Sequence, residues 1–155
     1  MKIIEGDLMD ITSGVIVQQV NCQNTIGAGL SGAIIEKYPL VKERYHKLCT
    51  GRKPKELFGL CLPVKINEDL TIVSSFSQLY YGNALKTFRT YTDENTLVHN
   101  IERIVERYKN RQVYLPWKIG CGLAGGNWDS VLERIKDLPV IIVRPVNCMN
   151  RVILQ

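Results

Sequence analysis

Two short glycine-rich stretches constrain the fold of this chain more than any other feature. Residues 119–126 read I-G-C-G-L-A-G-G, and residues 26–32 read I-G-A-G-L-S-G. Each stretch follows an apolar, strand-like run and precedes residues with helical spacing. Because glycine lacks a Cβ atom and accepts positive φ, such a turn lets the backbone approach an anion closely. Its N–H groups and those of the first helical turn then face the same negative charge.

Both stretches match the spacing G-x-G-x-x-G. The matching residues are Gly27, Gly29, Gly32, Gly120, Gly122 and Gly125. A single match is weak evidence, because short glycine motifs recur by chance. Two interpretations stay open: two unrelated tight turns, or two loops that close on one diphosphate. The recurrence in equivalent settings favours the second interpretation.

Two common nucleotide-binding folds fit the sequence poorly. A Rossmann domain carries its glycines directly after a strand and an acidic residue about 20 positions later, on the next strand. Here the polar residues 21–25 separate the apolar run from Gly27, and the next expected strand carries Lys65 near its end. A P-loop needs G-K-[ST], which follows neither glycine stretch.

The length of 155 residues is enough to bury one good core, so a single domain over residues 1–155 is expected. The 45% hydrophobic and 23% charged residues are ordinary for a soluble globule. No apolar run is long enough to span a bilayer, and residues 1–7 lack the apolar segment of a signal peptide. We therefore expect no membrane association and a cytoplasmic location. The tail, residues 146–155, has no clear pattern, and its role stays open.

The histidines and cysteines of the chain give little support for a metal site or a bound cofactor. There are two histidines and five cysteines with no C-x-x-C pair, so neither a zinc site nor a cofactor is expected. The cysteines are Cys22, Cys49, Cys61, Cys121 and Cys148. We expect them to be reduced thiols. The net charge of +5 suits an anionic ligand, but lysines and arginines form no block, so nucleic acid is not an expected partner.

Strand patterns alternate with helical patterns along the chain. Strands are expected at residues 1–5, 15–20, 58–66, 70–76, 112–117 and 140–143. Helices are expected after Ser31, which can cap the first one, from Pro39, after Asp93 or Asn95, and after residue 127. Residues 50–56 read as a charged turn. Residues 78–93 have no clear periodicity but are rich in aromatic residues. Long irregular segments of this kind are often functional, and the alternative is that the aromatic rings simply cover the edge of the sheet.

This alternation predicts an α/β fold, a three-layer α/β/α sandwich with a mixed six-stranded sheet. Ligands in such folds collect beyond the carboxyl ends of the central strands. Both glycine stretches and residues 21–25 are expected there.

Several motifs together resemble a macrodomain. They are G-D-L at residues 6–8, V-N-C-Q-N at 20–24, I-G-A-G at 26–29 and I-G-C-G-L-A-G-G at 119–126. The likeness runs from residue 1 to about residue 145. The pairing of G-C-G-L with Trp128 resembles the branch that contains the ADP-ribose-1''-phosphate phosphatases and the terminal ADP-ribose protein glycohydrolase.

The resemblance implies that this chain binds ADP-ribose or a derivative, alone or attached to a protein. Asp7 would accept a hydrogen bond from the adenine amino group, and Asn24 would hold the distal ribose as a candidate catalytic residue. Tyr80 or Tyr81 is a candidate to stack on adenine. The full ligand-binding set implied is Asp7, Leu8, Asn21, Asn24, Gly27, Ala28, Gly29, Ile119, Gly120, Cys121, Gly122 and Leu123.

The chain departs from the glycohydrolase at two positions. That enzyme uses a lysine that forms an adduct with the ribose and an aspartate just after G-C-G-L. Here the aspartate position is Ala124, and residues 74–78, which would carry the lysine, read S-S-F-S-Q. Asp129 and Asn127 lie close by, but capping of the next helix explains them equally well. Cys121 has no histidine placed to activate it, so an inert thiol is the better interpretation.

Three functions remain after the sequence analysis. The first is a hydrolase of an ADP-ribose derivative, with removal of a terminal phosphate from ADP-ribose-1''-phosphate favoured over ADP-ribosyl hydrolysis. The second is a module that reads or sequesters ADP-ribose-containing molecules without turnover. The third, least favoured, is a binder of single-stranded nucleic acid, which would need stacking aromatics on a basic groove.

Overall fold

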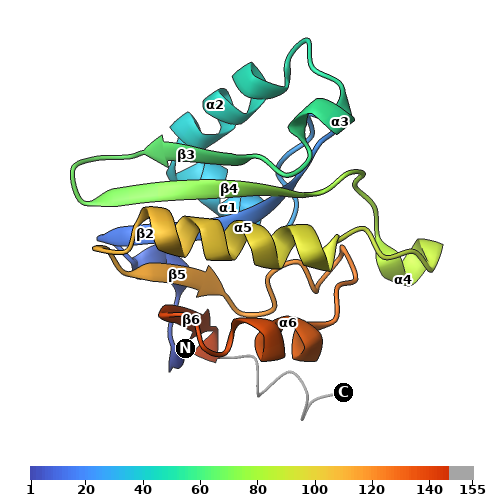
Figure 1. Ribbon diagram of the computed structural model, residues 1–155. Helices are drawn as coiled ribbons and strands as arrows, with labels where there is room; N and C mark the ends of the chain where they lie inside the picture. The colour runs from blue at the N-terminus through green and yellow to red at the C-terminus, as the bar shows by residue number, and fades with distance from the viewer. Residues whose placement is uncertain (147–155) are drawn as a thin grey trace.

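The computed structural model describes residues 1–146, and its centre is one sheet of six strands (Figure 1). The strands are β1 (Lys2–Glu5), β2 (Gly14–Asn21), β3 (Cys61–Lys65), β4 (Leu70–Gln78), β5 (Val113–Pro116) and β6 (Val140–Arg144). Their order in the sheet is β1-β6-β5-β2-β4-β3. All neighbours are parallel except β3, which is antiparallel to β4, so the predicted mixed sheet is confirmed.

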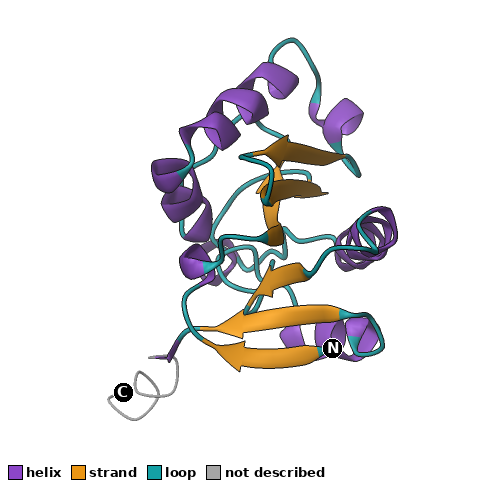
Figure 2. Ribbon diagram, turned by 90° about the vertical axis from the view of Figure 1, so that its left-hand side faces the viewer, coloured by secondary structure: helices purple, strands orange, loops and turns teal. Residues whose placement is uncertain are grey.

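Helices cover both faces of this sheet (Figure 2). They are α1 (Leu30–Lys37), α2 (Pro39–Cys49), α3 (Pro54–Leu57), α4 (Ala84–Thr87), α5 (Glu94–Arg107), α6 (Trp128–Ile135) and the 3₁₀ turn η1 (Leu8–Asp10). Alternate residues of β2 point to opposite faces. Ile16 packs with Ile34 of α1 and Val41 of α2, whereas Val17 packs with Ile101 of α5. The predicted three-layer sandwich is therefore confirmed.

Three local expectations about secondary structure are wrong. Residues 54–57 form α3 instead of a charged turn, because Pro54 suits the first helical position and the Glu56 side chain accepts from the Lys53 N–H at 2.6 Å. As a result β3 begins at Cys61, three residues later than expected. Residues 84–87 form α4 within the segment that looked irregular. Ser31 does not cap α1, since Gly29 holds that position and the Ser31 hydroxyl donates to Gln18.

The capping predictions for the later helices hold. Asp93 caps α5 by accepting from the Thr96 N–H at 2.9 Å. Asn127 caps α6 by accepting from the Ser130 N–H at 3.1 Å. Pro39 occupies the first turn of α2, as expected.

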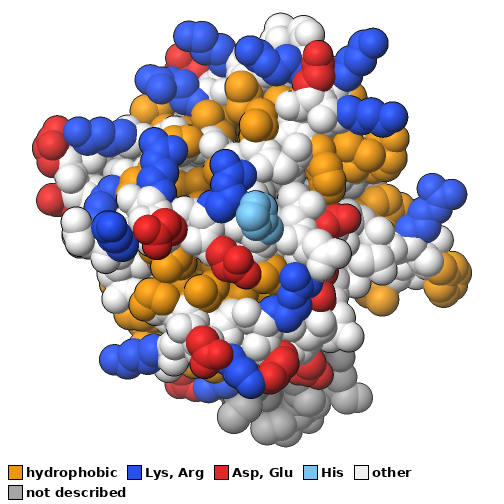
Figure 3. Space-filling model, in the orientation of Figure 1, with side chains coloured by type: hydrophobic (Ala, Val, Ile, Leu, Met, Phe, Trp, Pro, Cys, Tyr) orange, Lys and Arg blue, Asp and Glu red, His pale blue; other side chains and the backbone are white. Residues whose placement is uncertain are grey.

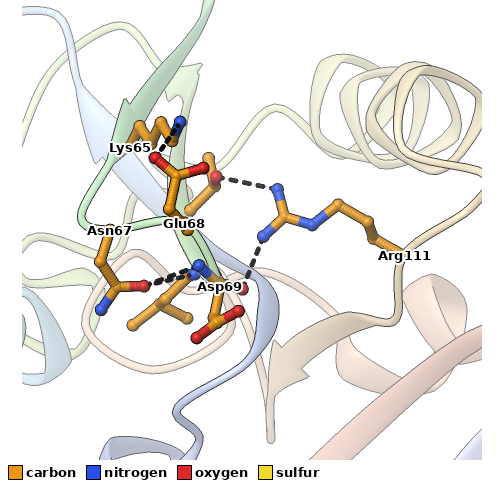
Figure 4. Close-up of polar contacts among 7 residues, drawn as sticks. Lys65, Asn67, Glu68, Asp69 and Arg111 are labelled. Carbon is orange, nitrogen blue, oxygen red and sulfur yellow. Dashed lines mark hydrogen bonds and ion pairs between the residues drawn. The ribbon is translucent and has the colours of Figure 1, made fainter.

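The amino ends of the central strands are held together by Arg111, whose contacts to the start of β4 are drawn in Figure 4. The Arg111 guanidinium donates to the carbonyl oxygens of Gly14 and Asp69 at 2.8 Å and to the Thr71 hydroxyl at 2.9 Å. In the adjoining β3–β4 turn, the Asn67 side chain accepts from the N–H groups of Asp69 and Leu70. These hydrogen bonds therefore connect β2, β4 and the β3–β4 turn at this end of the sheet.

None of the helices in residues 1–146 is long and apolar enough to cross a membrane.

Candidate functional site

A groove runs along the carboxyl ends of the parallel strands. It consists of three adjoining hollows with volumes of about 650, 340 and 620 Å³. The first two hollows share Ser31, Gln78 and Leu123, and the second and third share Leu30 and Trp117. The groove is therefore continuous, and it occupies the place where open α/β sheets bind ligands.

The first glycine loop forms one wall of the groove. Gly27 and Gly29 have φ of +135° and +57°, which side chains rarely tolerate. Gly32 lets α1 pack tightly, since a Cβ atom there would lie 2.7 Å from the Gly27 carbonyl oxygen. The loop is held from below by Tyr45 of α2. Its hydroxyl donates to Asn21 at 3.0 Å and accepts from the Thr25 N–H at 3.1 Å.

The second glycine loop forms the opposite wall and is built in the same way. Gly120 has φ of +70°, and a Cβ atom there would lie 2.9 Å from the Gln19 side-chain oxygen. A Cβ atom on Gly126 would lie 2.6 Å from the Gly120 carbonyl oxygen. Glycine at this position therefore allows the end of the loop, just before α6, to pack closely against its beginning. Gly122 faces open space, with nothing within 4 Å of a Cβ atom placed on it. The loop therefore presents bare backbone to the groove at Gly122.

A network of side-chain hydrogen bonds lies beneath the groove and joins the second loop to the sheet. Gln19 of β2 donates to Thr92 at 2.8 Å and to Gln78 at 3.0 Å, and it accepts from Ser77 at 2.7 Å. The Thr92 hydroxyl in turn donates to the carbonyl oxygen of Gly120. Every polar atom that this network buries has a partner, as a rigid site requires.

The third hollow lies beside η1. Asp7 caps η1 by accepting from the Met9 N–H at 2.9 Å, and its side chain remains exposed at the rim. Leu8 and Trp117 line the same hollow. The Arg144 guanidinium lies 5.2 Å from the centre of the Trp117 ring, a cation–π contact that fixes the ring on the groove.

Most of the residues expected at the site line the groove. They are Asp7, Leu8, Asn21, Gly27, Ala28, Gly29, Ile119, Gly120, Gly122 and Leu123. Asn24 and Cys121 are not among the lining residues. Asn24 has φ of +55°, and its side-chain oxygen lies 2.6 Å from Nδ1 of His46 on α2. The catalytic role of Asn24 stays a prediction, and its amide is engaged outside the groove.

Cys121 is partly buried behind the second loop. Its thiol contacts the Ile119 carbonyl oxygen at 3.2 Å, and burial, helped by the Glu94 charge, raises the pKa of the thiol to about 11. A thiol protonated at neutral pH is a poor nucleophile. The geometry agrees with an inert thiol at this position.

Several residues at the groove were not anticipated from the sequence. Trp117 and Lys118 line its middle, and Gln78 and Asn83 line the end near Asn21. A signal existed for Lys118, because a cation between a strand and a glycine loop suits an anion. None existed for Gln78 and Asn83, since their position depends on where β4 ends and α4 begins.

Tyr81 lines the hollow near Asn21, whereas Asp7 lines the hollow at the other end, and these two hollows share no residue. One adenine therefore cannot contact both side chains. The aromatic ring that lines the same hollow as Asp7 is Trp117. Stacking of Tyr80 or Tyr81 on adenine stays a prediction.

Protein-family models and curated proteins gave no match to the sequence. Solved structures do match over nearly the whole chain. A protein of unknown function from Bacteroides thetaiotaomicron has a TM-score of 0.75 at 23% identity, over 94% of this chain and 97% of that one. The macrodomain of Mycobacterium tuberculosis DarG has a TM-score of 0.70 at 21% identity, over 93% and 95%.

A third structure, Thermosipho africanus DarTG in complex with ADP-ribose, matches with a TM-score of 0.70 at 21% identity. It covers 94% of this chain but only 42% of that longer chain. The likeness to such structures over nearly the whole chain leads to one conclusion: this chain has the macrodomain fold.

Proposed function

We propose that the groove binds ADP-ribose along its length. Adenine would lie at the Asp7 and Trp117 end, the diphosphate between the two glycine loops, and the distal ribose near Asn21 and Asn83. The observation that carries this proposal is the placement of the two loops on facing walls of one groove. Support comes also from a solved structure of the same fold that holds ADP-ribose.

The backbone of the loops suits a diphosphate. Within residues 1–146, the N–H groups of Ala28, Gly29, Gly122 and Leu123 donate to no protein acceptor. Unpaired N–H groups around a concave turn form an anion-binding site. Lys118, exposed on the same stretch of groove, adds a positive charge.

A finer proposal is that the groove removes the terminal phosphate of ADP-ribose-1''-phosphate. The hollow near Asn21 is lined by amides and hydroxyls, including Asn21, Gln78 and Asn83. Among the described residues that line it there is no carboxylate, imidazole or thiol. Catalysis would therefore rely on a water molecule oriented by amides and on N–H groups that stabilise developing charge. ADP-ribosyl hydrolysis has less support, because Ala124 and the absence of lysine from β4 argue against the lysine-dependent route.

Binding is tested by calorimetry with ADP-ribose. We expect the parent to bind and Gly122→Glu to lose binding, because the new carboxylate would enter the place of the diphosphate. Gly122→Ala, which meets no atom within 4 Å, should bind much better than Gly122→Glu. Lys47→Gln, which lowers the net charge by one as Gly122→Glu does but on the exposed side of α2, serves as a matched control. Normal binding by a folded Gly122→Glu protein would contradict the proposed path of the ligand.

Turnover is tested separately by phosphate release from ADP-ribose-1''-phosphate. If the predicted catalytic role of Asn24 holds, its amide must leave His46 and turn into the groove. Asn24→Ala should then reduce kcat more than it weakens affinity, since an interaction that orients water tightens in the transition state. A parent that binds ADP-ribose but releases no phosphate, and no ADP-ribose from modified protein, would leave the binding module as the function.

A further inference from the structure

The hydrogen bonds that hold the second glycine loop continue through the core to the far side of α5. The side chains that form them, in order from donor to acceptor, are Arg103, Asn100, Ser75, Ser77, Gln19 and Thr92, and the last donates to the Gly120 carbonyl oxygen. We call this set of side chains the polar row. Asn100, Ser75 and Ser77 are 1%, 0% and 0% exposed, so this part of the row is shielded from water.

The polar row begins at the surface, on a face separate from the groove. Arg103 is exposed and lines a hollow of about 470 Å³ beside α5, which shares no lining residue with the groove. Figure 3 shows this face, where charged side chains of both signs lie with hydrophobic side chains between them. The Arg103 guanidinium donates to the Asn100 side-chain oxygen at 3.4 Å and to the Gly59 carbonyl oxygen at 3.3 Å. The row therefore connects two separate surfaces of the protein.

Every hydrogen bond in the polar row runs in the same direction, and its two ends fix that direction. A guanidinium can only donate, so Arg103 holds the Asn100 oxygen toward itself and leaves the amide nitrogen to donate to Ser75 at 3.0 Å. A carbonyl oxygen can only accept, so Thr92 must donate to Gly120. Because hydrogen bonds aligned in this way polarise one another, a change at the Arg103 end should alter the bond at Gly120.

The stability of the core does not by itself explain the polar row. Apolar groups of the same shape in place of paired polar groups can leave a core about as stable. The strand β4 nevertheless buries Ser75 and Ser77, and its register against β2 shifts after Phe76, so that Ser77 has no partner in β2. Irregularities of this β-bulge type turn a side chain toward a site. Here the Ser77 hydroxyl donates to Gln19, which leads the row from β4 toward the groove.

We propose that Asn100 and Ser75 are positioning residues for the second glycine loop. Neither lines the groove, and both act through Thr92 on the Gly120 carbonyl. Arg103 sets the direction of the row and so couples the α5 face to the groove. The effect on ligand affinity rests on the proposed function, because the N–H groups of this loop are the ones assigned to the diphosphate.

The first test observes the loop without ligand, by NMR of the backbone amides. The Cys121 N–H belongs to the same peptide group as the Gly120 carbonyl. The Gly126 N–H donates to that carbonyl at 3.0 Å. The signals of these two amides therefore report on the bond that Thr92 makes to Gly120.

Two variants change the polar row, and each has a matched control. Ser75→Ala and Arg103→Met should both shift the two amide signals. Thr71→Val also removes a buried hydroxyl from β4, and Arg107→Met removes an equal charge from the same hollow, but both should leave the two signals in place. Arg103→Met changes only an exposed side chain, so it decides the test if Ser75→Ala is too unstable to study.

The second test measures ADP-ribose binding by calorimetry. Ser75→Ala should bind about threefold or more weakly than the parent, as residues coupled to a site through packed networks do. Thr71→Val should bind as the parent does, although it too loses a buried hydrogen bond. If Ser75 acts through Thr92, adding Ser75→Ala to Thr92→Val should weaken binding little further, whereas independent effects would multiply.

Three results would overturn the positioning role. They are unchanged amide signals in Ser75→Ala and Arg103→Met, shifts of the same size in the controls, and effects of Ser75→Ala and Thr92→Val on affinity that multiply. If the two signals shift as expected but the parent does not bind ADP-ribose, the proposed function fails and the positioning of the loop by the polar row stands.

Discussion

Thr92 donates its hydroxyl hydrogen to the carbonyl oxygen of Gly120, and this contact ties the second glycine loop to the network around Gln19. Thr92 is buried and lies just before α5, outside the lining of the main groove. The loop that faces the groove is therefore positioned from behind by a residue that does not line the groove.

Replacing Thr92 with valine tests this arrangement, since the shape is kept and the hydroxyl is lost. The Gly120 carbonyl and the Gln19 amide would each lose a buried partner, at a cost of about 1–3 kcal/mol. We expect lower stability in urea and an affinity for ADP-ribose reduced by about tenfold. Thr92→Ser should restore the affinity, because serine keeps the donor. If Thr92→Val is destabilised but binds ADP-ribose normally, the hydroxyl has a structural role only.

Asp7 provides the test of ligand orientation. If its carboxylate accepts from the adenine amino group, Asp7→Ala should weaken ADP-ribose binding by about tenfold or more, since a hydrogen bond to a charged acceptor is worth about 1.5–3 kcal/mol. Asp7 also caps η1, so loss of the cap is a second route to lower affinity, and a second ligand separates the two effects.

The second ligand is the hypoxanthine analogue of ADP-ribose, which carries a carbonyl group in place of the adenine amino group. The parent should prefer ADP-ribose to this analogue, and Asp7→Ala should bind the two nearly equally. An unchanged preference in Asp7→Ala, measured by calorimetry, would remove adenine from the Asp7 end of the groove.

Cys121 gives a prediction that depends on pH. Burial raises the pKa of its thiol to about 11, so its thiolate is scarce at neutral pH and increases only in strongly alkaline solution. Alkylation by iodoacetamide requires the thiolate. With an ordinary cysteine pKa of about 8.5, Cys121 should react on the order of a hundredfold more slowly than a free thiol at pH 7. Mass spectrometry of the modified peptides measures this rate, and rapid labelling of Cys121 would restore it as a candidate nucleophile.

Arg111 should matter for stability and not for binding. Its three hydrogen bonds join the amino ends of β2 and β4, at the end of the sheet away from the groove. Figure 4 shows the two bonds to the β4 side, to Asp69 and Thr71. Arg111→Met leaves two carbonyl groups and a hydroxyl without this donor, and we expect a loss of about 1–3 kcal/mol in the free energy of unfolding. Arg44→Met, on the exposed side of α2, should cost much less in the same urea titration. A stability of Arg111→Met equal to that of the parent would show that solvent replaces these bonds.

The sheet was predictable from sequence because its strands follow strong local rules. Apolar, β-branched runs such as residues 15–20 predict buried strands. Pro39 suits the first turn of a helix, and the side chains of Asp93 and Asn127 cap the helices that follow them. The glycine loops of the site could be predicted from the sequence, because the backbone conformation of such tight turns requires glycine.

The remaining features depend on contacts between distant segments, which no local pattern encodes. Ser31 has the composition of a helix cap, but Gln18 of β2 engages its hydroxyl. Asn24 lies in a motif that resembles a ribose-binding one, and yet His46 of α2 holds its amide. The helix α4 was unexpected, because Leu85 and Phe88 give no amphipathic period when neither is buried.

The pairing of the first strand with the last has a consequence for synthesis. β1 lies at the edge of the sheet with β6 as its neighbour, and Lys2 pairs with Ile141. A ribosome adds about 5–20 residues per second, so β6, the strand that pairs with β1 in the described sheet, is synthesised on the order of ten seconds after β1. During that interval its open edge is a template for wrong pairing. Its four residues, Lys2 and Glu5 among them, keep this waiting strand short and charged, which limits aggregation of the nascent chain.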